Sequence, residues 1–459
     1  MTSDRGAKDR GAKDGGAKTV GACHDPYLRC AFYGAAQTAV GVAHACVLAH
    51  SPQGCELLVG TAFGWQQADY IETKSLCTKL CEDEIVHGGE ETLARTIEEA
   101  KVFDVPVVFV LSACGPEIVG DNIAAVCREM ATKVPFRLVP IECAGFRGSQ
   151  YDGVDIALDA VLKSMLDEPG ESPAERAIPN SVVLIAPHGS SNPTWPGDLT
   201  WVKATLERLG LRALVSLTHR TPLEDIGLAA RAEWSLVLSH DCGYRAAAEL
   251  EGRGVKPLLP EVPLPIGFAG TTRWLRVLGE TLGREREAET LIDEGEKFTV
   301  EQCRRQGLEI QFFNRTRVAI LADATLGLPL LRVAVEDLEM EPVAVGLRSN
   351  QPRALAMLEA EAKELGTPLP VVPGLDVYGA KRILTDLHPD AVLASNIERH
   401  MAAEAGVTYC FRVANPVSRF RLTDRAYFGY TGFLNLMEII QNDWWDTFRS
   451  KKKRWEAKW

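Results

Sequence analysis

The sequence contains no run of about eighteen uncharged apolar residues, so it predicts no membrane-spanning helix. It also lacks an excess of basic residues, because its net charge is −12, which disfavours nucleic acid as a partner. A GxxxxGKS/T phosphate loop is absent, and no GxGxxG motif follows a first strand. The chain is therefore expected to bind neither ATP nor a dinucleotide.

Cysteine is too sparse for a disulfide scaffold, with 12 cysteines in 459 residues and no CxxC pair of the kind that marks many zinc sites. The N-terminus has no signal-peptide hydrophobic stretch. Residues 1–21 form an imperfect repeat of Gly, Ala, Lys and Asp without an apolar face, and we expect a disordered tail there. These features predict a protein of a reducing compartment, the cytoplasm.

Short β-rich runs such as VPVVFVL, SVVLIAP and RVAILAD alternate with longer segments of helical periodicity. This alternation is typical of α/β folds in which helices flank parallel sheets. We therefore predict three Rossmann-like domains over residues 22–175, 176–310 and 311–459. The last domain ends in a segment rich in tryptophan and basic residues, which is expected to form a helix at a subunit interface.

Three cysteines lie in short motifs that contain glycine: Cys30 in RCAFYGA, Cys55 in HSPQGC and Cys114 in LSACGPEIVGDN. Apolar stretches precede Cys55 and Cys114, so we expect the sulfurs where parallel strands end. Thiolates are soft ligands that favour Fe–S clusters, zinc or copper. The three cysteines are candidate ligands of an Fe–S cluster, and a second chain is expected to complete the site. Alternatively, they are buried small hydrophobic residues or ligands of a zinc-stabilised binding protein.

Gly54 and Gly115 lie beside two of these cysteines. Glycine lets the backbone approach a bulky inorganic cluster closely, and N–H groups in such loops can donate to its sulfides. Both residues are candidate cluster-binding positions, or ordinary turn glycines. Cys77 and Cys81 stand four residues apart, which predicts that both lie on one face of a helix as core or interface thiols.

Five motifs follow one another between residues 30 and 153: CAFYGA, HSPQGC, EDEIVHGGEETL, SACGPEIVGDNI and ECAGFRGS. In this order they resemble the nitrogenase component 1 family, whose paired subunits hold a P-cluster between them. The resemblance implies that Cys30, Cys55 and Cys114 are the cluster ligands of one subunit. It also implies that Ser149 stands where a β-type subunit has a serine able to ligate the oxidised cluster; alternatively, its hydroxyl stabilises a turn.

In the resembled family, the α-type subunit holds a catalytic cofactor through a central cysteine and a histidine near the C-terminus. Cys242, in LVLSHDCGYRAA, is similar to the central cysteine motif, or is a packed thiol. The histidine is missing, since Asn415 is the nearest counterpart and no histidine follows His400. The resemblance therefore implies a β-like subunit that does not bind the catalytic cofactor and has no catalytic residue of its own.

The resemblance implies a nitrogenase-like oxidoreductase subunit with an 8Fe-7S P-cluster, or a related cluster, shared with an α-like subunit in an α2β2-type assembly. A separate ATP-dependent reductase homodimer with a 4Fe-4S cluster would deliver electrons, which the shared cluster would relay to the catalytic metallocofactor of the α-like subunit. We expect reductive C–S bond cleavage of methylthio-alkanes as the reaction. The alternatives are a dinitrogenase β subunit and a non-enzymatic scaffold for assembly of nitrogenase cofactor.

Overall fold

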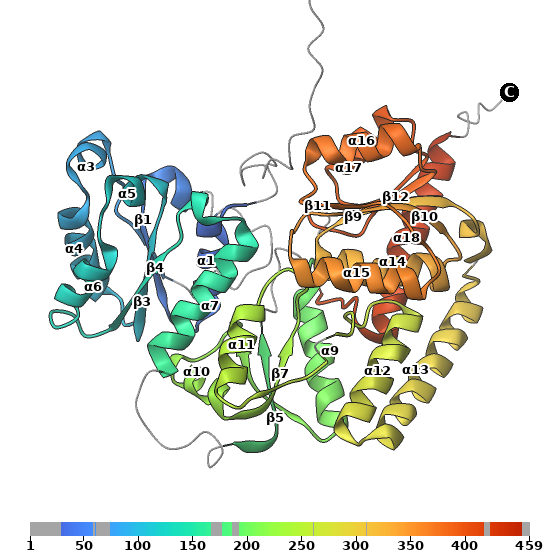
Figure 1. Ribbon diagram of the computed structural model, residues 1–459, viewed down its shortest axis with the longest axis horizontal. Helices are drawn as coiled ribbons and strands as arrows, with labels where there is room; N and C mark the ends of the chain where they lie inside the picture. The colour runs from blue at the N-terminus through green and yellow to red at the C-terminus, as the bar shows by residue number, and fades with distance from the viewer. Residues whose placement is uncertain are drawn as a thin grey trace, which may run out of the picture.

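The computed structural model describes residues 29–57, 60, 74–166, 177–185, 192–259, 261–308, 310–416 and 423–451. The predicted tail, residues 1–21, lies outside this part of the chain. The strands described form three sheets, all with parallel pairing, and helices cover them (Figure 1). The predicted α/β fold with three Rossmann-like units is confirmed, whereas the exact domain boundaries stay predictions.

The first sheet, on the left of Figure 1, has the strand order β2-β1-β3-β4. Its alternate residues face two different cores, one under α1 and α7 and one under α4 and α6. The strands are β1 (Cys46–His50), β2 (Lys74–Cys77), β3 (Val107–Ser112) and β4 (Arg137–Glu142). The helices are α1 (Ala31–Val40), α3 (Glu82–His87), α4 (Glu90–Glu99), α5 (Cys114–Val119), α6 (Ile123–Met130) and α7 (Gln150–Leu166).

The second sheet has the order β6-β5-β7-β8 and the third the order β11-β10-β9-β12-β13. The second unit contains β5 (Ile178–Ile185), α9 (Trp195–Arg208), β6 (Arg212–Leu217), α10 (Leu223–Ile226), β7 (Ala232–Val237), α11 (Tyr244–Gly252), β8 (Lys256–Pro257), α12 (Phe268–Leu282) and α13 (Glu285–Gln306). The third contains β9 (Arg317–Ala322), α14 (Ala324–Arg332), β10 (Glu341–Leu347), α15 (Pro352–Glu364), β11 (Val371–Pro373), α16 (Val377–Leu387), β12 (Ala391–Ala394), α17 (Glu398–Glu404), β13 (Tyr409–Arg412) and α18 (Gly429–Lys451).

The C-terminal helix α18 packs on its own chain. The ring of Trp444 stacks on the rings of Phe312 and Phe448, with centroids 4.8 and 5.3 Å apart, and Trp444 is only 9% exposed. Packing within the chain therefore accounts for part of the aromatic character of this segment. Trp445 is 39% exposed, so of the two tryptophans described in α18 it is the one that a partner could contact. No helix in the described part of the chain combines the length and apolar character needed to cross a bilayer.

Helices α1 and α7 touch through two glycines. A Cβ on Gly34 would overlap the carbonyl oxygen of Gln150, and a Cβ on Gly153 would overlap that of Ala31. Any larger residue would push the two helix backbones apart. This contact fixes the start of α1, where Cys30 is the N-cap residue.

Buried polar contacts join the three units, and α7 takes part in two of them. The Tyr151 hydroxyl on α7 donates to Asp323 of the third unit, and Asp155 accepts from the backbone N–H of Gly243 in the second unit at 2.7 Å. Asp241 of the second unit accepts from the two N–H groups that begin α14. Because buried polar groups need such partners, these contacts fix how the units sit together.

We expect Gly153→Ala to lower the free energy of unfolding by about 3 kcal/mol, because the new Cβ has no space between α1 and α7. Gly270→Ala, in α12, is the matched control: a Cβ there meets nothing within 4 Å, and higher helix propensity should stabilise the protein by up to about 1 kcal/mol. Urea unfolding measures both changes. Equal stability of the two variants would contradict the close contact.

The stability of the chain should also depend on the protonation of Asp323. Burial raises the pKa of Asp323 to about 7, although the nearby Arg348 favours its charged form, whereas an unfolded aspartate titrates near about 4. Between these two values the folded state binds a proton that the unfolded state has released, so the free energy of unfolding should fall as pH rises from about 4 to about 7 and then level off. Asp323→Asn should remove this part of the pH dependence in urea unfolding of the metal-free chain. A pH profile equal to that of the wild type would contradict the role of Asp323.

Candidate metal centre

The carboxyl-terminal edge of the first sheet carries the three predicted cysteines, and we call it the cysteine edge. Cys55 lies in the helical turn that follows β1, and Cys114 is the first residue of α5, just after β3. Cys30 reaches the same edge because its backbone pairs with that of Ser149, in the loop after β4. The sulfurs thus lie where parallel strands end, as the apolar runs before them predicted.

The sulfurs of Cys30 and Cys114 converge over Gly145, a residue that the sequence analysis did not single out. The Gly145 N–H donates to the Sγ of Cys114 at 3.1 Å. A Cβ on Gly145 would lie 3.0 Å from the Sγ of Cys114 and 3.5 Å from the Sγ of Cys30. Glycine therefore leaves open the space between these two sulfurs that an inorganic cluster needs, so the residues present fit such a group.

Cys55 belongs to the same group of thiols. Burial raises the pKa of Cys55, and the thiolates of Cys30, Cys114 and Cys77 raise it further by charge repulsion. Among the residues described, no three His, Cys, Asp or Glu side chains are spaced to hold a single metal ion. Ligation of an Fe–S cluster or of zinc by these cysteines stays a prediction.

The predicted glycines differ in their surroundings. A Cβ on Gly115 would lie 2.9 Å from the Cδ1 of Ile85, so the end of the Ile85 side chain would have to shift where α3 contacts α5. A Cβ on Gly54 would meet nothing within 4 Å, and Gly54 is exposed. A cluster-binding role for these two residues stays a prediction.

Ser149 makes the contacts that its turn-stabilising interpretation describes. Its hydroxyl and its backbone N–H both donate to the Oδ2 of Asp152 at 2.8 Å. Ser149 therefore stabilises the turn that leads into α7, which begins at Gln150. The side chain is beside Cys30 but already has a partner within the chain. Ligation of an oxidised cluster by Ser149 stays a prediction.

Cys242 lies far inside the molecule as a packed thiol. It is 3% exposed, its sulfur lies 3.5 Å from the hydroxyl of Ser239, and burial raises its pKa well above the ordinary value. A protonated, enclosed thiol is inert, so this environment offers no support for cofactor ligation.

The predicted helix that would carry both Cys77 and Cys81 is wrong. Cys77 ends strand β2, which pairs with β1, while Cys81 is the exposed N-cap residue of α3. The spacing of four fits one helix, but pairing with a strand distant in sequence separates the two residues into different elements.

Glu117 is a residue that the sequence analysis missed, although it lies inside a quoted motif. Its Oε1 accepts from the hydroxyl of Ser112 at 2.5 Å and from the N–H of Ala144 at 2.9 Å. Its Oε2 accepts from the Nε of Arg147 at 2.5 Å. One carboxylate thus ties the turn of Cys114 to the loop that contains Gly145.

Asp121 also connects separate segments of the first sheet unit through its carboxylate. Its carboxylate accepts from the N–H of Gly89 at 2.9 Å and contacts the Nε2 of His50 at 3.0 Å. His50 is fully buried, and burial lowers its pKa even though Asp121 opposes this, so the imidazole is neutral near pH 7 and donates through Nε2. The two motifs HGGEE and VGDN therefore meet in space through these side chains.

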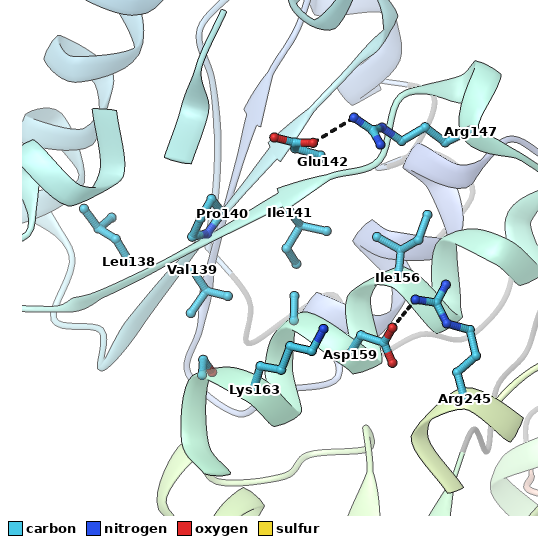
Figure 2. Close-up of a pocket in the computed structure, with 12 residues that line it drawn as sticks. Leu138, Val139, Pro140, Ile141, Glu142, Arg147, Ile156, Asp159, Lys163 and Arg245 are labelled. Carbon is cyan, nitrogen blue, oxygen red and sulfur yellow. Dashed lines mark hydrogen bonds and ion pairs between the residues drawn. The ribbon is translucent and has the colours of Figure 1, made fainter. Parts of the chain in front are cut away.

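A surface groove of about 760 Å³ lies between β4 and α7 (Figure 2). Four of its charged side chains form pairs, Glu142 with Arg147 and Asp159 with Arg245, and Lys163 lines it as well. No cysteine lines it. The groove therefore adds no ligand to the metal centre.

Asp121→Asn should lower the free energy of unfolding by about 2 to 3 kcal/mol, because a neutral amide cannot replace a buried carboxylate that accepts from Gly89 and His50. Asp104→Asn is the control, since Asp104 is exposed. Chemical unfolding followed by circular dichroism measures both variants. Unfolding of the two at the same denaturant concentration would contradict the structural role of Asp121.

Comparison with known proteins places these features in a family. Residues 30–444 match the family model for nitrogenase component 1 type oxidoreductase. The chain is 25% identical to the nitrogenase iron-molybdenum cofactor biosynthesis protein NifE of Methanococcus maripaludis, over 90% of this chain and 82% of that protein. It is 26% identical to the nitrogenase molybdenum-iron protein alpha chain of Methanothermobacter marburgensis, over 91% of this chain and 88% of that one.

The nitrogenase vanadium-iron protein beta chain of Trichormus variabilis is 25% identical, over 91% of this chain and 93% of its own length. A solved structure of nitrogenase Cp1 at pH 6.5 has the same fold, with a TM-score of 0.78, 18% sequence identity and coverage of 98% of both chains. The family model spans most of the chain and begins at Cys30, the first of the clustered cysteines. The chain belongs to the nitrogenase component 1 type oxidoreductase family.

Proposed function

We propose that this chain is one subunit of a paired scaffold on which a nitrogenase-type metallocofactor is assembled, and that Cys30, Cys55 and Cys114 hold an Fe–S cluster in it. The observation that carries the proposal is the convergence of these thiols at one open sheet edge. Support for a scaffold comes from relatives named for cofactor biosynthesis, which align over 90% of the chain. The named relatives give no support to the predicted methylthio-alkane reductase.

The residues of the cysteine edge suit thiolate ligation. Each cysteine must release its proton to bind iron, and the N–H of Gly145 stabilises the resulting charge on the Cys114 sulfur. Glu117 and Asp121 hold the loops that carry the ligands, so little reorganisation is needed on loading. A bound Fe–S cluster would supply one-electron transfer.

Exposed apolar side chains around the cysteine edge support a partner subunit. Leu57 is 64% exposed, Val86 71%, Ile118 74% and Phe146 61%. Leu57 and Phe146 follow Cys55 and Gly145 closely in sequence, Ile118 belongs to the helix begun by Cys114, and Val86 lies on α3, which contacts α5. Burial of such residues stabilises association, so an α-like chain would cover this edge in an α2β2-type complex.

The electron source and the location are carried over from the family resemblance. Since the sequence contains no nucleotide-binding motif, an ATP-dependent reductase with a 4Fe-4S cluster would supply electrons in the cytoplasm. The missing C-terminal histidine and the packed Cys242 favour a β-like chain.

A second candidate function is that of a β subunit in a dinitrogenase, with a P-cluster shared between subunits. The alignment with a vanadium-iron protein beta chain over 93% of that chain favours it. In this case the cluster site would be the same, but the purified complex would reduce a substrate.

The test is anaerobic co-purification of the chain with its partner subunit, followed by iron and sulfide analysis. Cys55→Ala should lower bound iron by roughly an order of magnitude and weaken the pairing, because ligation and assembly share one surface. Cys303→Ala, on α13 of the second unit, should leave both unchanged. Normal iron in the Cys55 variant would contradict the site.

Two activity assays separate the candidate functions. A scaffold should pass a cofactor to an apo-nitrogenase and remain inactive on dinitrogen and thioethers, even with a reductase and ATP. Turnover of either substrate without any cofactor transfer would contradict the scaffold and favour a reductase.

A further inference from the structure

We infer that Cys77 is a fourth thiolate ligand, so that this chain carries a complete four-cysteine site and can hold a 4Fe-4S cluster without a thiolate from its partner. The inference rests on the proposed cluster site and deepens it. It differs from the expectation that a second chain must complete the ligand set. Four cysteine thiolates are the usual requirement of such a cluster.

Strand pairing brings Cys77 to the cysteine edge. Cys77 is the last residue of β2 and pairs with Ala49 of β1 in a parallel register. Its sulfur lies 3.5 Å from the carbonyl oxygen and 3.6 Å from the hydroxyl of Ser51, on the segment that leads from β1 to Cys55. Cys77 therefore lies beside the segment that leads to Cys55, although 22 positions separate the two cysteines in the sequence.

The order of the strands makes the segments that carry the cysteines neighbours. Along β2-β1-β3-β4, Cys77 ends the first strand, Cys55 and Cys114 lie in the segments that follow the next two, and the loop after β4 holds Gly145, over which the sulfur of Cys30 lies. Cys30, Cys55 and Cys77 are also each partly buried against the same hydrophobic core.

The Cys77 sulfur contacts a backbone acceptor, the carbonyl of Ser51, and also a backbone N–H donor. The N–H of Lys79 donates to the Cys77 sulfur at 3.4 Å, just as the N–H of Gly145 donates to Cys114. Lys79 itself has a φ of 53°, in the left-handed region, which marks a tight turn directly after β2. A backbone N–H donor stabilises a thiolate and tunes a cluster.

Other cysteines of the first sheet provide the contrast. Cys46 and Cys127 face the opposite core, are almost fully buried, and burial raises the pKa of each to about 12. Cys81 is exposed and donates to the carbonyl of Lys79. Cys77 alone among these lies half-buried next to the predicted ligands, at a position that can meet a cluster.

The test uses the full chain purified alone under anaerobic conditions and loaded with ferrous iron and sulfide. We expect about four iron atoms and four sulfides per chain. Cys77→Ala should lose at least half of the iron and the electron paramagnetic resonance spectrum of the reduced cluster. Cys81→Ala, four residues away, is the matched control and should match the wild type in both. If Cys77→Ala keeps the iron content and the spectrum of the wild type, the inference is overturned.

Alkylation of the wild-type chain covers the case in which Cys77→Ala does not fold. Mass spectrometry after iodoacetamide treatment should find Cys77 protected in the loaded chain and labelled once a chelator has removed the iron. Cys81 should be labelled in both states. Labelling of Cys77 in the loaded chain would exclude it as a ligand.

Failure of this inference is distinguishable from failure of the proposed function. A chain that holds no cluster alone, but holds one sensitive to Cys55→Ala when paired with its partner, would overturn the role of Cys77 and leave the shared site standing. Absence of iron and sulfide both from the chain alone and from the paired complex would overturn the two together.

Discussion

Parallel pairing of four strands is the constraint on which the candidate site depends. In a parallel sheet all carboxyl ends meet at one edge, so residues distant in sequence become neighbours there. β2 ends at Cys77, Cys55 and Cys114 lie in the segments that follow β1 and β3, and the loop after β4 supplies the glycine over which Cys30 lies. The carboxylates of Glu117 and Asp121 then fix the loops, because each accepts several donors from separate segments. The site is thus a product of sheet topology first and of side-chain contacts second.

Helix α7 connects this edge to the rest of the molecule. Its first turn lies beside Cys30, its face carries the close glycine contact with α1, and Tyr151 and Asp155 reach the other two units. These polar contacts are buried, so their loss would leave unsatisfied groups inside the protein. The position of Cys30 therefore depends on packing well outside the first sheet.

Much of the fold could be predicted from the sequence, because alternating apolar runs and helical periods are local features that mark parallel α/β units. The same applies to Cys55 and Cys114, each of which follows such a run. Cys77 could not be placed in this way, since only the pairing of β2 with β1 brings it to the edge. Glu117 and Asp121 look like ordinary solvated carboxylates in the sequence, and Trp444 looks like an interface residue until Phe312, from a distant segment, stacks on it. Non-local contacts account for each of these gaps.

The glycine contact and the polar contacts of α7 have a consequence for cooperativity. A fragment that ended with α7 would keep the first sheet but would expose Tyr151 and Asp155 without their partners in the other units. Folding of the first sheet is therefore coupled to that of the other two units through α7. A substitution that loosens Asp323 or Gly243, far from the thiols in sequence, should accordingly be felt at Cys30, which lies beside the first turn of α7.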